Sequence, residues 1–204
     1  MPNDKHDLIL DTALRLAGES SWEALRLHHV AAALGIGLED IRHHFREKED
    51  LVDAWFDRAD RALLQQARAS DVITLSTRGR LTRTLMAWLD TLAPHRRVTR
   101  QMVLNKFEPG HLHYQLNGAL RVSRTVQWWR EAAARDAVLP WRAVEETGLT
   151  GIFLTVFGYW MQDDSPQSAR TRALLERLLQ QAAQVATWLP GLKPRRASAT
   201  GAPP

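Results

Sequence analysis

The sequence of 204 residues contains no cysteine. This absence excludes disulfide bonds, thiolate-ligated zinc, iron–sulfur clusters and thiol nucleophiles, and it agrees with a reducing compartment. Long hydrophobic runs are also missing, because the longest apolar-rich run, Leu149 to Met161, is shorter than the roughly 18–20 residues that span a bilayer. The first residues lack the charged-then-apolar order of a signal peptide. These absences favour a soluble, cytoplasmic protein without membrane insertion.

Catalytic and metal-binding motifs are absent as well. The chain has no glycine-rich phosphate loop, no nucleophile elbow and no H-E-x-x-H sequence. The pair Asp163-Asp164 is better explained as part of a loop that joins two helices than as an acid and base pair. The histidines of His28-His29, His43-His44 and His111-x-His113 point to different faces of a helix and complete no site. We therefore predict no enzyme activity, no metal and no cofactor.

The composition that remains is that of a globular protein. Hydrophobic residues make up 45% of the chain and charged residues 25%, which excludes disorder of the whole chain. The charge is unevenly placed, because residues 1–50 hold six lysines and arginines against ten aspartates and glutamates, a net charge of −4 in a chain of +4. The remaining residues therefore carry +8.

Strand signals are nearly absent, since no stretch of five or more residues alternates apolar and polar residues with β-branched enrichment. Helical spacing recurs from end to end and predicts an all-α protein of about nine helices. We expect Gly18 to end the first helix, and we expect the apolar segment 151–161 to be covered on both faces. The predicted helices cover about 4–18, 27–34, 38–45, 48 onward, a stripe ended by Pro94, 98–106, 111–136, 140–162 and a last one after Pro166.

The second and third predicted helices are joined by a short turn that contains Gly35 and Gly37, a pattern typical of a helix-turn-helix motif. The segments 8–14, 30–36 and 41–51 resemble the N-terminal domain of TetR/AcrR-type regulators. The resemblance covers about residues 6–55, and its most specific piece is the H-F-x-x-K-x-x-L pattern of His44, Phe45, Lys48 and Leu51. It implies an N-terminal three-helix DNA-binding domain followed by a C-terminal helical domain for ligand binding and dimerisation.

The resemblance further implies a TetR-like DNA-binding transcriptional regulator, expected to be a repressor. As a homodimer it would bind a palindromic double-stranded operator, with two recognition helices in successive major grooves, and an apolar or aromatic small-molecule ligand would control it. We predict a DNA-binding domain at 1–50, a ligand-binding and dimerisation domain at 51–190, and a disordered tail at 191–204.

The start of the recognition helix departs from the family pattern. Gly37, Leu38, Glu39 and Asp40 stand where the family usually has Ser, a variable or basic residue, Gly and Thr. Arg42 replaces a tyrosine that reaches a phosphate and can make the same contact with a full charge. Glu39 either accepts a hydrogen bond from a cytosine amino group or, with Asp40, caps the helix. The predicted DNA contacts are Gly37, Leu38, Arg42, His43 and Lys48, of which Lys48 matches the phosphate-contacting lysine of the family.

Two further sets of residues are predicted in the C-terminal half. Eight tryptophans in one chain are many, and most of them lie where a helical bundle would form an apolar pocket. The predicted ligand-lining residues are Trp88, Met102, Phe107, Tyr114 and Trp128. The predicted dimer-interface residues, which would pair in a four-helix bundle, are Phe153, Phe157, Leu174, Leu178 and Val185.

An alternative function stays open. The segment 157–166, followed by Thr171 and 174–178, resembles the end of the TetR-derived lipid-binding proteins of ubiquinone biosynthesis, which keep the fold without acting as repressors. The negative charge of residues 1–50 agrees with this alternative, because such a domain gains little from counterion release on DNA. The alternative is therefore a lipid- or isoprenoid-binding accessory protein with a vestigial DNA-binding head.

Overall fold

The chain is helical throughout the part that the structure describes. This computed structural model describes residues 4–105, 112–134 and 141–188. Those ranges contain ten α-helices, two 3₁₀ helices and no strand, which confirms the all-α prediction. The elements are α1 Asp4–Glu19, α2 Leu27–Leu34, α3 Leu38–His44, α4 Lys48–Ala67, α5 Ser70–Ile73, α6 Thr77–Leu92, η1 Ala93–His95, α7 Arg96–Asn105, α8 Leu112–Ala132, α9 Trp141–Trp160, η2 Pro166–Ser168 and α10 Ala169–Trp188.

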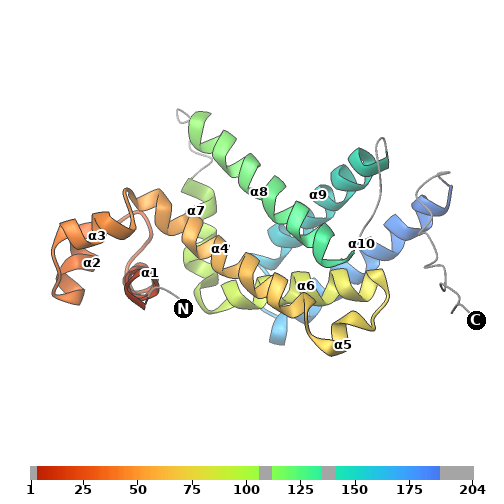
Figure 1. Cartoon of the computed structure of the whole chain (residues 1–204), viewed down its shortest axis with the longest axis horizontal. Coiled ribbons are helices and arrows are strands. Elements are labelled where there is room, and N and C mark those ends of the chain that lie inside the picture. The colour runs from red at the N-terminus through yellow and green to blue at the C-terminus, as the bar shows by residue number, and fades with distance from the viewer. Residues whose placement is uncertain (1–3, 106–111, 135–140, 189–204) are drawn as a thin grey trace, which may run out of the picture.

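The first three helices form the head, which lies at one end of the elongated molecule (Figure 1). Helix α2 lies where the apolar spacing predicts it, whereas α1 continues one residue beyond Gly18, so this glycine does not end the helix. Gly35 ends α2 in the left-handed conformation with φ of 65°, which residues with a β-carbon disfavour. Its N–H faces the carbonyls of Ala31 and Ala32. This turn directs the chain into α3, which packs against α2.

Helix α4 connects the head to the rest of the molecule. It begins at Lys48, as predicted, because the Asp50 carboxylate accepts hydrogen bonds from the N–H of Arg46 at 2.6 Å and of Glu47 at 3.1 Å. Its 20 residues make a helix about 30 Å long, which packs against α1 and along α6 and α8. The predicted domain boundary at residue 50 falls inside this continuous helix and stays a prediction, and the tail predicted at 191–204 lies outside the described residues.

Helices α5 to α10, together with the part of α4 that packs against α6 and α8, form the body, whose core is aromatic. Trp88 of α6 packs against Phe56, Phe153 and Phe157, with ring centres 5.8, 5.2 and 5.3 Å away. Helix α9 packs against α8 and α10, and α10 also reaches α6 (Figure 1). The apolar stripe that predicts α6 is buried throughout, at Leu81, Leu85, Trp88, Leu89 and Leu92.

Asp163 organises the loop between α9 and α10, in agreement with its predicted place in a helix-joining loop. Its carboxylate accepts hydrogen bonds from the N–H of Ser165 and of Thr171, both at 2.9 Å, and from the Thr171 hydroxyl at 2.6 Å. Burial acts to raise the pKa of Asp163, but the hydrogen bonds from Ser165 and Thr171 outweigh it and hold the pKa well below its usual range. The ionised carboxylate therefore fixes the start of α10.

Within the protomer, one face of the second half of α9 is buried and the other is exposed, so the expectation that both faces of 151–161 are covered stays a prediction that requires a second copy. Phe153 and Phe157 are buried against Trp88, whereas Leu154 and Tyr159 are exposed on the opposite face. Residues four apart share one face of a helix, and here that face meets α6. The two phenylalanines therefore belong to the core of the protomer, and their part in a dimer interface stays a prediction. None of the described helices is long and apolar enough to cross a membrane.

Candidate nucleic-acid interface

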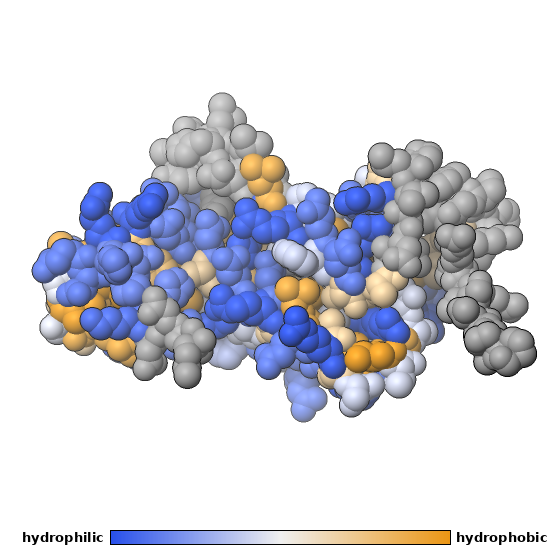
Figure 2. All heavy atoms as spheres, viewed as in Figure 1, coloured by the Kyte–Doolittle hydropathy of each residue, from blue (hydrophilic) through white to orange (hydrophobic). Residues whose placement is uncertain are grey.

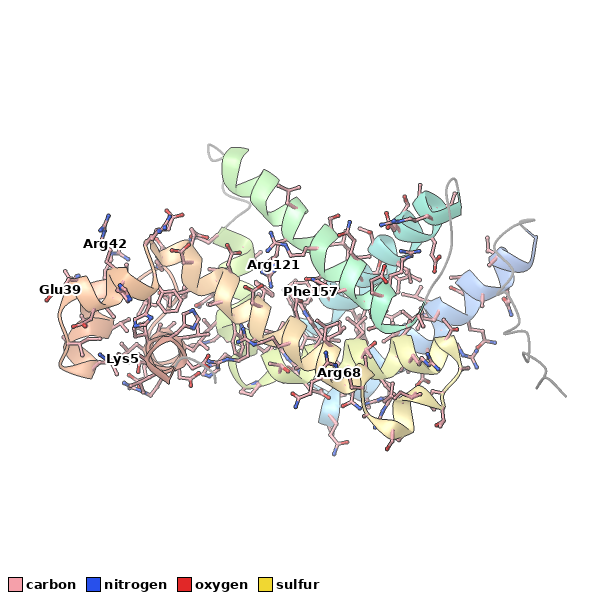
Figure 3. All side chains as sticks on the ribbon, in the orientation of Figure 1. Lys5, Glu39, Arg42, Arg68, Arg121 and Phe157 are labelled. Carbon is pink, nitrogen blue, oxygen red and sulfur yellow. The ribbon has the colours of Figure 1, made fainter. Side chains whose placement is uncertain are left out.

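Helix α3 turns one face to the solvent at the outer end of the head. Ile41 is buried, as is Phe45, the residue that follows the helix, so these two side chains anchor α3. The exposed residues are Leu38, which is 53% exposed, Glu39, Arg42 and His43, and we call these four the outer face of α3. Figure 3 shows Glu39 and Arg42 on the head, at the end of the molecule far from the body, and Figure 2 shows that this end is largely hydrophilic with apolar patches along its lower edge. This face is free for contact with another molecule.

Asp40, and not Glu39, caps the N-terminus of α3. The Asp40 carboxylate accepts a hydrogen bond from the Gly37 N–H at 3.2 Å. Glu39 makes no hydrogen bond or ion pair within the described residues, and its carboxylate folds over Gly37, where a β-carbon would collide with it. The two acidic residues therefore differ in their contacts. Asp40 caps the helix, whereas the Glu39 carboxylate has no hydrogen bond or ion pair among the described residues.

Lys48, the predicted phosphate contact, has partners inside the protein. Its Nζ donates to the carbonyls of Trp22 and, at 3.5 Å, of Glu23, and lies 4.7 Å from the centre of the Trp22 ring. Burial lowers the pKa of Lys48, and the nearby Arg26 lowers it further. The lysine thus ties the first turn of α4 to the loop between α1 and α2.

The same loop is fastened to α7. The side-chain oxygen of Gln101 accepts a hydrogen bond from the Trp22 N–H at 2.8 Å, and Arg97 donates to the Gly18 carbonyl. Trp22 is therefore held from α7 through its N–H and from α4 through its carbonyl, which receives Lys48. No sequence signal indicates these bonds, because Trp22 and Gln101 are 79 positions apart and belong to no common motif.

A polar network lies inside the body, where α4, α6 and α8 meet. The buried Asp60 carboxylate accepts hydrogen bonds from Trp88 Nε1 at 2.8 Å, from the Thr125 hydroxyl at 3.0 Å and from Arg121 at 3.0 Å. Arg121, labelled in Figure 3, also donates to Asp57. Burial raises the pKa of Asp60, although Arg121 and the two uncharged donors act against this rise. Sequence reasoning missed this network, since its members are spread over three helices.

The structure describes the side chains of three of the five predicted ligand-lining residues. Trp88 and Met102 are fully buried, and aromatic side chains pack around Trp88, whereas Trp128 is 46% exposed. Phe107 and the side chain of Tyr114 lie outside the described residues. Trp88 is therefore core in this structure, and the ligand role of the five residues stays a prediction.

A cavity of about 210 Å³ lies between the head and α4. Its lining is mostly polar and consists of His6, His44, Phe45, Asp50, Asp53, Ala54, Asp57 and Arg61. His6 stacks on Phe45 with 4.4 Å between ring centres, and burial lowers the pKa of His6. This lining does not suit an apolar ligand. Within the described ranges, no group of three His, Cys, Asp or Glu side chains could hold a metal ion.

A helix-turn-helix head with an exposed recognition helix, joined by one long helix to an all-helical body, defines a class of DNA-binding regulators. The family model described as "Bacterial regulatory proteins, tetR family" matches residues 9–55. A crystal structure of the TetR transcriptional regulator from Nitrosomonas europaea ATCC 19718 is 46% identical, with a TM-score of 0.81, over 92% of this chain and 100% of that chain. The chain belongs to the TetR family of transcriptional regulators.

A second solved structure is more distant. It is a bacterial regulatory protein in the tetR family from Rhodococcus RHA1, 18% identical with a TM-score of 0.48, over 85% of this chain and 95% of that chain. No curated protein matches the chain. The family assignment therefore depends on the Nitrosomonas relative and on the N-terminal match.

Proposed function

We propose that the head binds double-stranded operator DNA by placing the outer face of α3 in the major groove. The observation that carries this proposal is the division of α3, in which Ile41 is buried while Leu38, Arg42 and His43 are exposed. Arg42 offers N–H donors to a phosphate or to guanine, and Leu38 offers an apolar contact to a thymine methyl. Gly37, at the N-terminus of α3, is not offered to a phosphate in this structure, because its N–H donates to the Asp40 carboxylate and the Glu39 carboxylate lies over it.

Lys48 supports this interface in two ways. Its bonds to the carbonyls of Trp22 and Glu23 hold the loop that precedes α2 in place. An ammonium group has three N–H bonds, so one donor remains for a phosphate of the operator. A contact of this kind strengthens binding to every sequence alike, because phosphates carry no base identity.

The palindromic operator requires two heads, and we propose that the protein is a homodimer. Apolar side chains are exposed on α9 and α10, with Val185 61% exposed and Leu154 and Tyr159 also on the surface. Leu174 and Leu178, which belong to the predicted interface, are half-buried on α10. A second copy would cover these residues in an isologous interface. Light scattering at micromolar concentration should give the mass of a dimer, and Leu154→Lys should lower it toward that of a monomer.

We further propose that the regulator acts in the cytoplasm as a repressor, without catalysis, and that an apolar small molecule bound in the body releases it from DNA. The aromatic character of the body supports an apolar ligand, because Trp88, Trp129 and Trp160 are all buried in it. Apolar and aromatic compounds that raise the melting temperature of the protein and also weaken its DNA binding would identify such a ligand.

Fluorescence anisotropy tests the DNA proposal. The purified protein is titrated onto DNA from upstream of its own coding region and onto a shuffled duplex, over a series of salt concentrations. We expect saturable, sequence-selective binding, which Arg42→Ala weakens while flattening the salt slope by about one unit if Arg42 contacts a phosphate. Arg83→Ala is the matched control, because Arg83 is exposed on α6, pairs with Asp71 and loses the same charge.

Absence of binding by the wild-type protein at low salt would contradict the proposal. The head would then be vestigial, and mass spectrometry of the purified protein should detect a bound lipid or isoprenoid. Equal loss of binding in the Arg42 and Arg83 variants would instead indicate that total charge, and not the outer face of α3, governs the interaction.

A further inference from the structure

We propose that Glu39 determines part of the operator sequence by accepting a hydrogen bond from the amino group of a cytosine in the major groove. This inference rests on the proposed binding of DNA by the head. It assigns to one carboxylate a role that neither the family membership nor the overall fold specifies.

The position of Glu39 on α3 is the first support. Glu39, Arg42 and His43 are spaced i, i+3 and i+4, so they share one face of the helix, and all three are exposed. Glu39 is the second residue of α3, and residues at the N-terminal end of a recognition helix are the ones that contact base edges. Figure 3 shows Glu39 and Arg42 at the outer end of the head.

The second support is that no hydrogen bond or ion pair among the described residues engages this carboxylate, which contributes to α3 only as a negative charge in its first turn. Asp40 already accepts the hydrogen bond from the Gly37 N–H and so caps the helix. Glu39 has no hydrogen-bond or ion-pair partner among the described residues, and it lies over Gly37, a residue without a side chain to obstruct it. Helix capping therefore does not explain why an acid occupies the residue before Asp40.

The chemistry of DNA then selects the base. An ionised carboxylate has acceptors only, so phosphate oxygens and the acceptor edges of guanine and thymine repel it. Cytosine and adenine present amino donors in the major groove, but adenine places its N7 acceptor beside the amino group, whereas cytosine does not. Arg42, one turn further along the same face, supplies a positive charge that offsets the repulsion between Glu39 and the nearby phosphates.

Selection from a random duplex library tests the inference. The wild-type protein, Glu39→Ala and Glu39→Gln are each allowed to select their preferred sequences, and the affinities for the four bases at each position are then measured. We expect the wild type to require cytosine at one position of each half-site, with discrimination of roughly 5- to 100-fold. Glu39→Ala should lose the preference at that position alone, and Glu39→Gln should shift it toward adenine, which pairs with an amide through N6 and N7.

Glu176→Gln is the matched control, since Glu176 is an exposed glutamate on α10 in the body, and its selected sequence should equal that of the wild type. If Glu39→Ala selects the same base at every position, the inference is wrong, even when all affinities rise together, because the carboxylate would then only repel phosphate. If the wild type binds no duplex at low salt, the DNA proposal itself fails and this inference with it.

Discussion

The head and the body of this regulator fill their interiors with different chemistry. In the described residues of α1 to α3, the buried side chains are apolar apart from Thr12. The body instead encloses charged and polar groups, among them Asp60, Arg121 and Thr125. An apolar core needs only to be filled, whereas a buried ion pair needs every partner present. The free energy of unfolding should therefore fall when a buried side chain of the head loses volume, and when a buried side chain of the body loses its charge.

The largest effect is expected from Arg121→Met in the body. The variant leaves Asp60 buried without its cation, and breaking a buried pair in this way costs about 3–5 kcal/mol of unfolding free energy at neutral pH. The pKa of Asp60, already raised by burial, should rise further. A carboxyl group whose pKa is raised in the folded state makes its full contribution to the free energy of unfolding below its unfolded-state pKa of about 4. This contribution is lost as the pH rises through the folded-state pKa.

The loss of unfolding free energy in Arg121→Met, relative to the wild type, should therefore be smaller at pH 5 than at pH 7.5. Urea denaturation at both pH values measures it. Arg124→Met is the control, because Arg124 is exposed on the same helix and undergoes the same change. A deficit that does not depend on pH would mean that Arg121 matters for its volume and not for its charge.

In the head, Leu14→Ala should lower the free energy of unfolding by about 3 kcal/mol, because it removes most of a fully buried side chain and leaves a cavity. No titratable group enters this argument, so the loss should be the same at pH 7.5 and pH 5. Leu8→Ala provides the comparison, since Leu8 is exposed on the same helix and its truncation should change the unfolding free energy little. A pH-dependent loss in Leu14→Ala would remove the contrast between head and body.

A second prediction for the body concerns Asp163→Asn, which should lower the free energy of unfolding by about 2 kcal/mol at neutral pH. The reason is that the variant weakens hydrogen bonds to an ionised acceptor. Despite burial, hydrogen bonds from Ser165 and Thr171 lower the pKa of Asp163. A lowered pKa contributes stability above the unfolded value of about 4, and this contribution is lost as the pH falls below it. The difference between variant and wild type should therefore narrow in acid, starting below pH 4. The neighbouring and exposed Asp164 supplies the control, Asp164→Asn, which should show no such change.

The sequence predicts the head well because the signals there are local. Apolar spacing sets α2 and α3, Gly35 ends α2 through its own backbone conformation, and Asp50 caps α4 from within four residues. The outer face of α3 follows from the same spacing. Periodicity also places Phe153 and Phe157 on one face of α9, but it could not indicate that this face packs against α6 within the protomer.

The other contacts could not be predicted from the sequence, because they join segments that are far apart in the chain. Asp60 and Arg121 are 61 positions apart, and their pairing depends on how α4 and α8 cross. Lys48 stands in the sequence where the family pattern has a lysine, yet only the structure shows that its side chain donates to the Trp22 carbonyl. A motif indicates which residue is present at an interface, whereas the partners of that residue depend on the packing of the whole chain.

The smallest effect concerns the junction at which the two regions meet. Gln101→Ala removes the acceptor of the Trp22 N–H and should lower the free energy of unfolding by about 1 kcal/mol. Hydrogen exchange at the Trp22 amide should become faster. Gln101→Glu keeps an acceptor at this place and should restore protection, and Gln127→Ala, an exposed glutamine on α8, should have no effect. Unchanged exchange at Trp22 in Gln101→Ala would mean that this hydrogen bond does not help to hold the head on the body, which would then depend on apolar contacts and on other polar ties such as those of Lys48 and Arg97. Faster exchange would instead show that a polar bond, and not only the apolar core of the head, fixes the position of the head on the body.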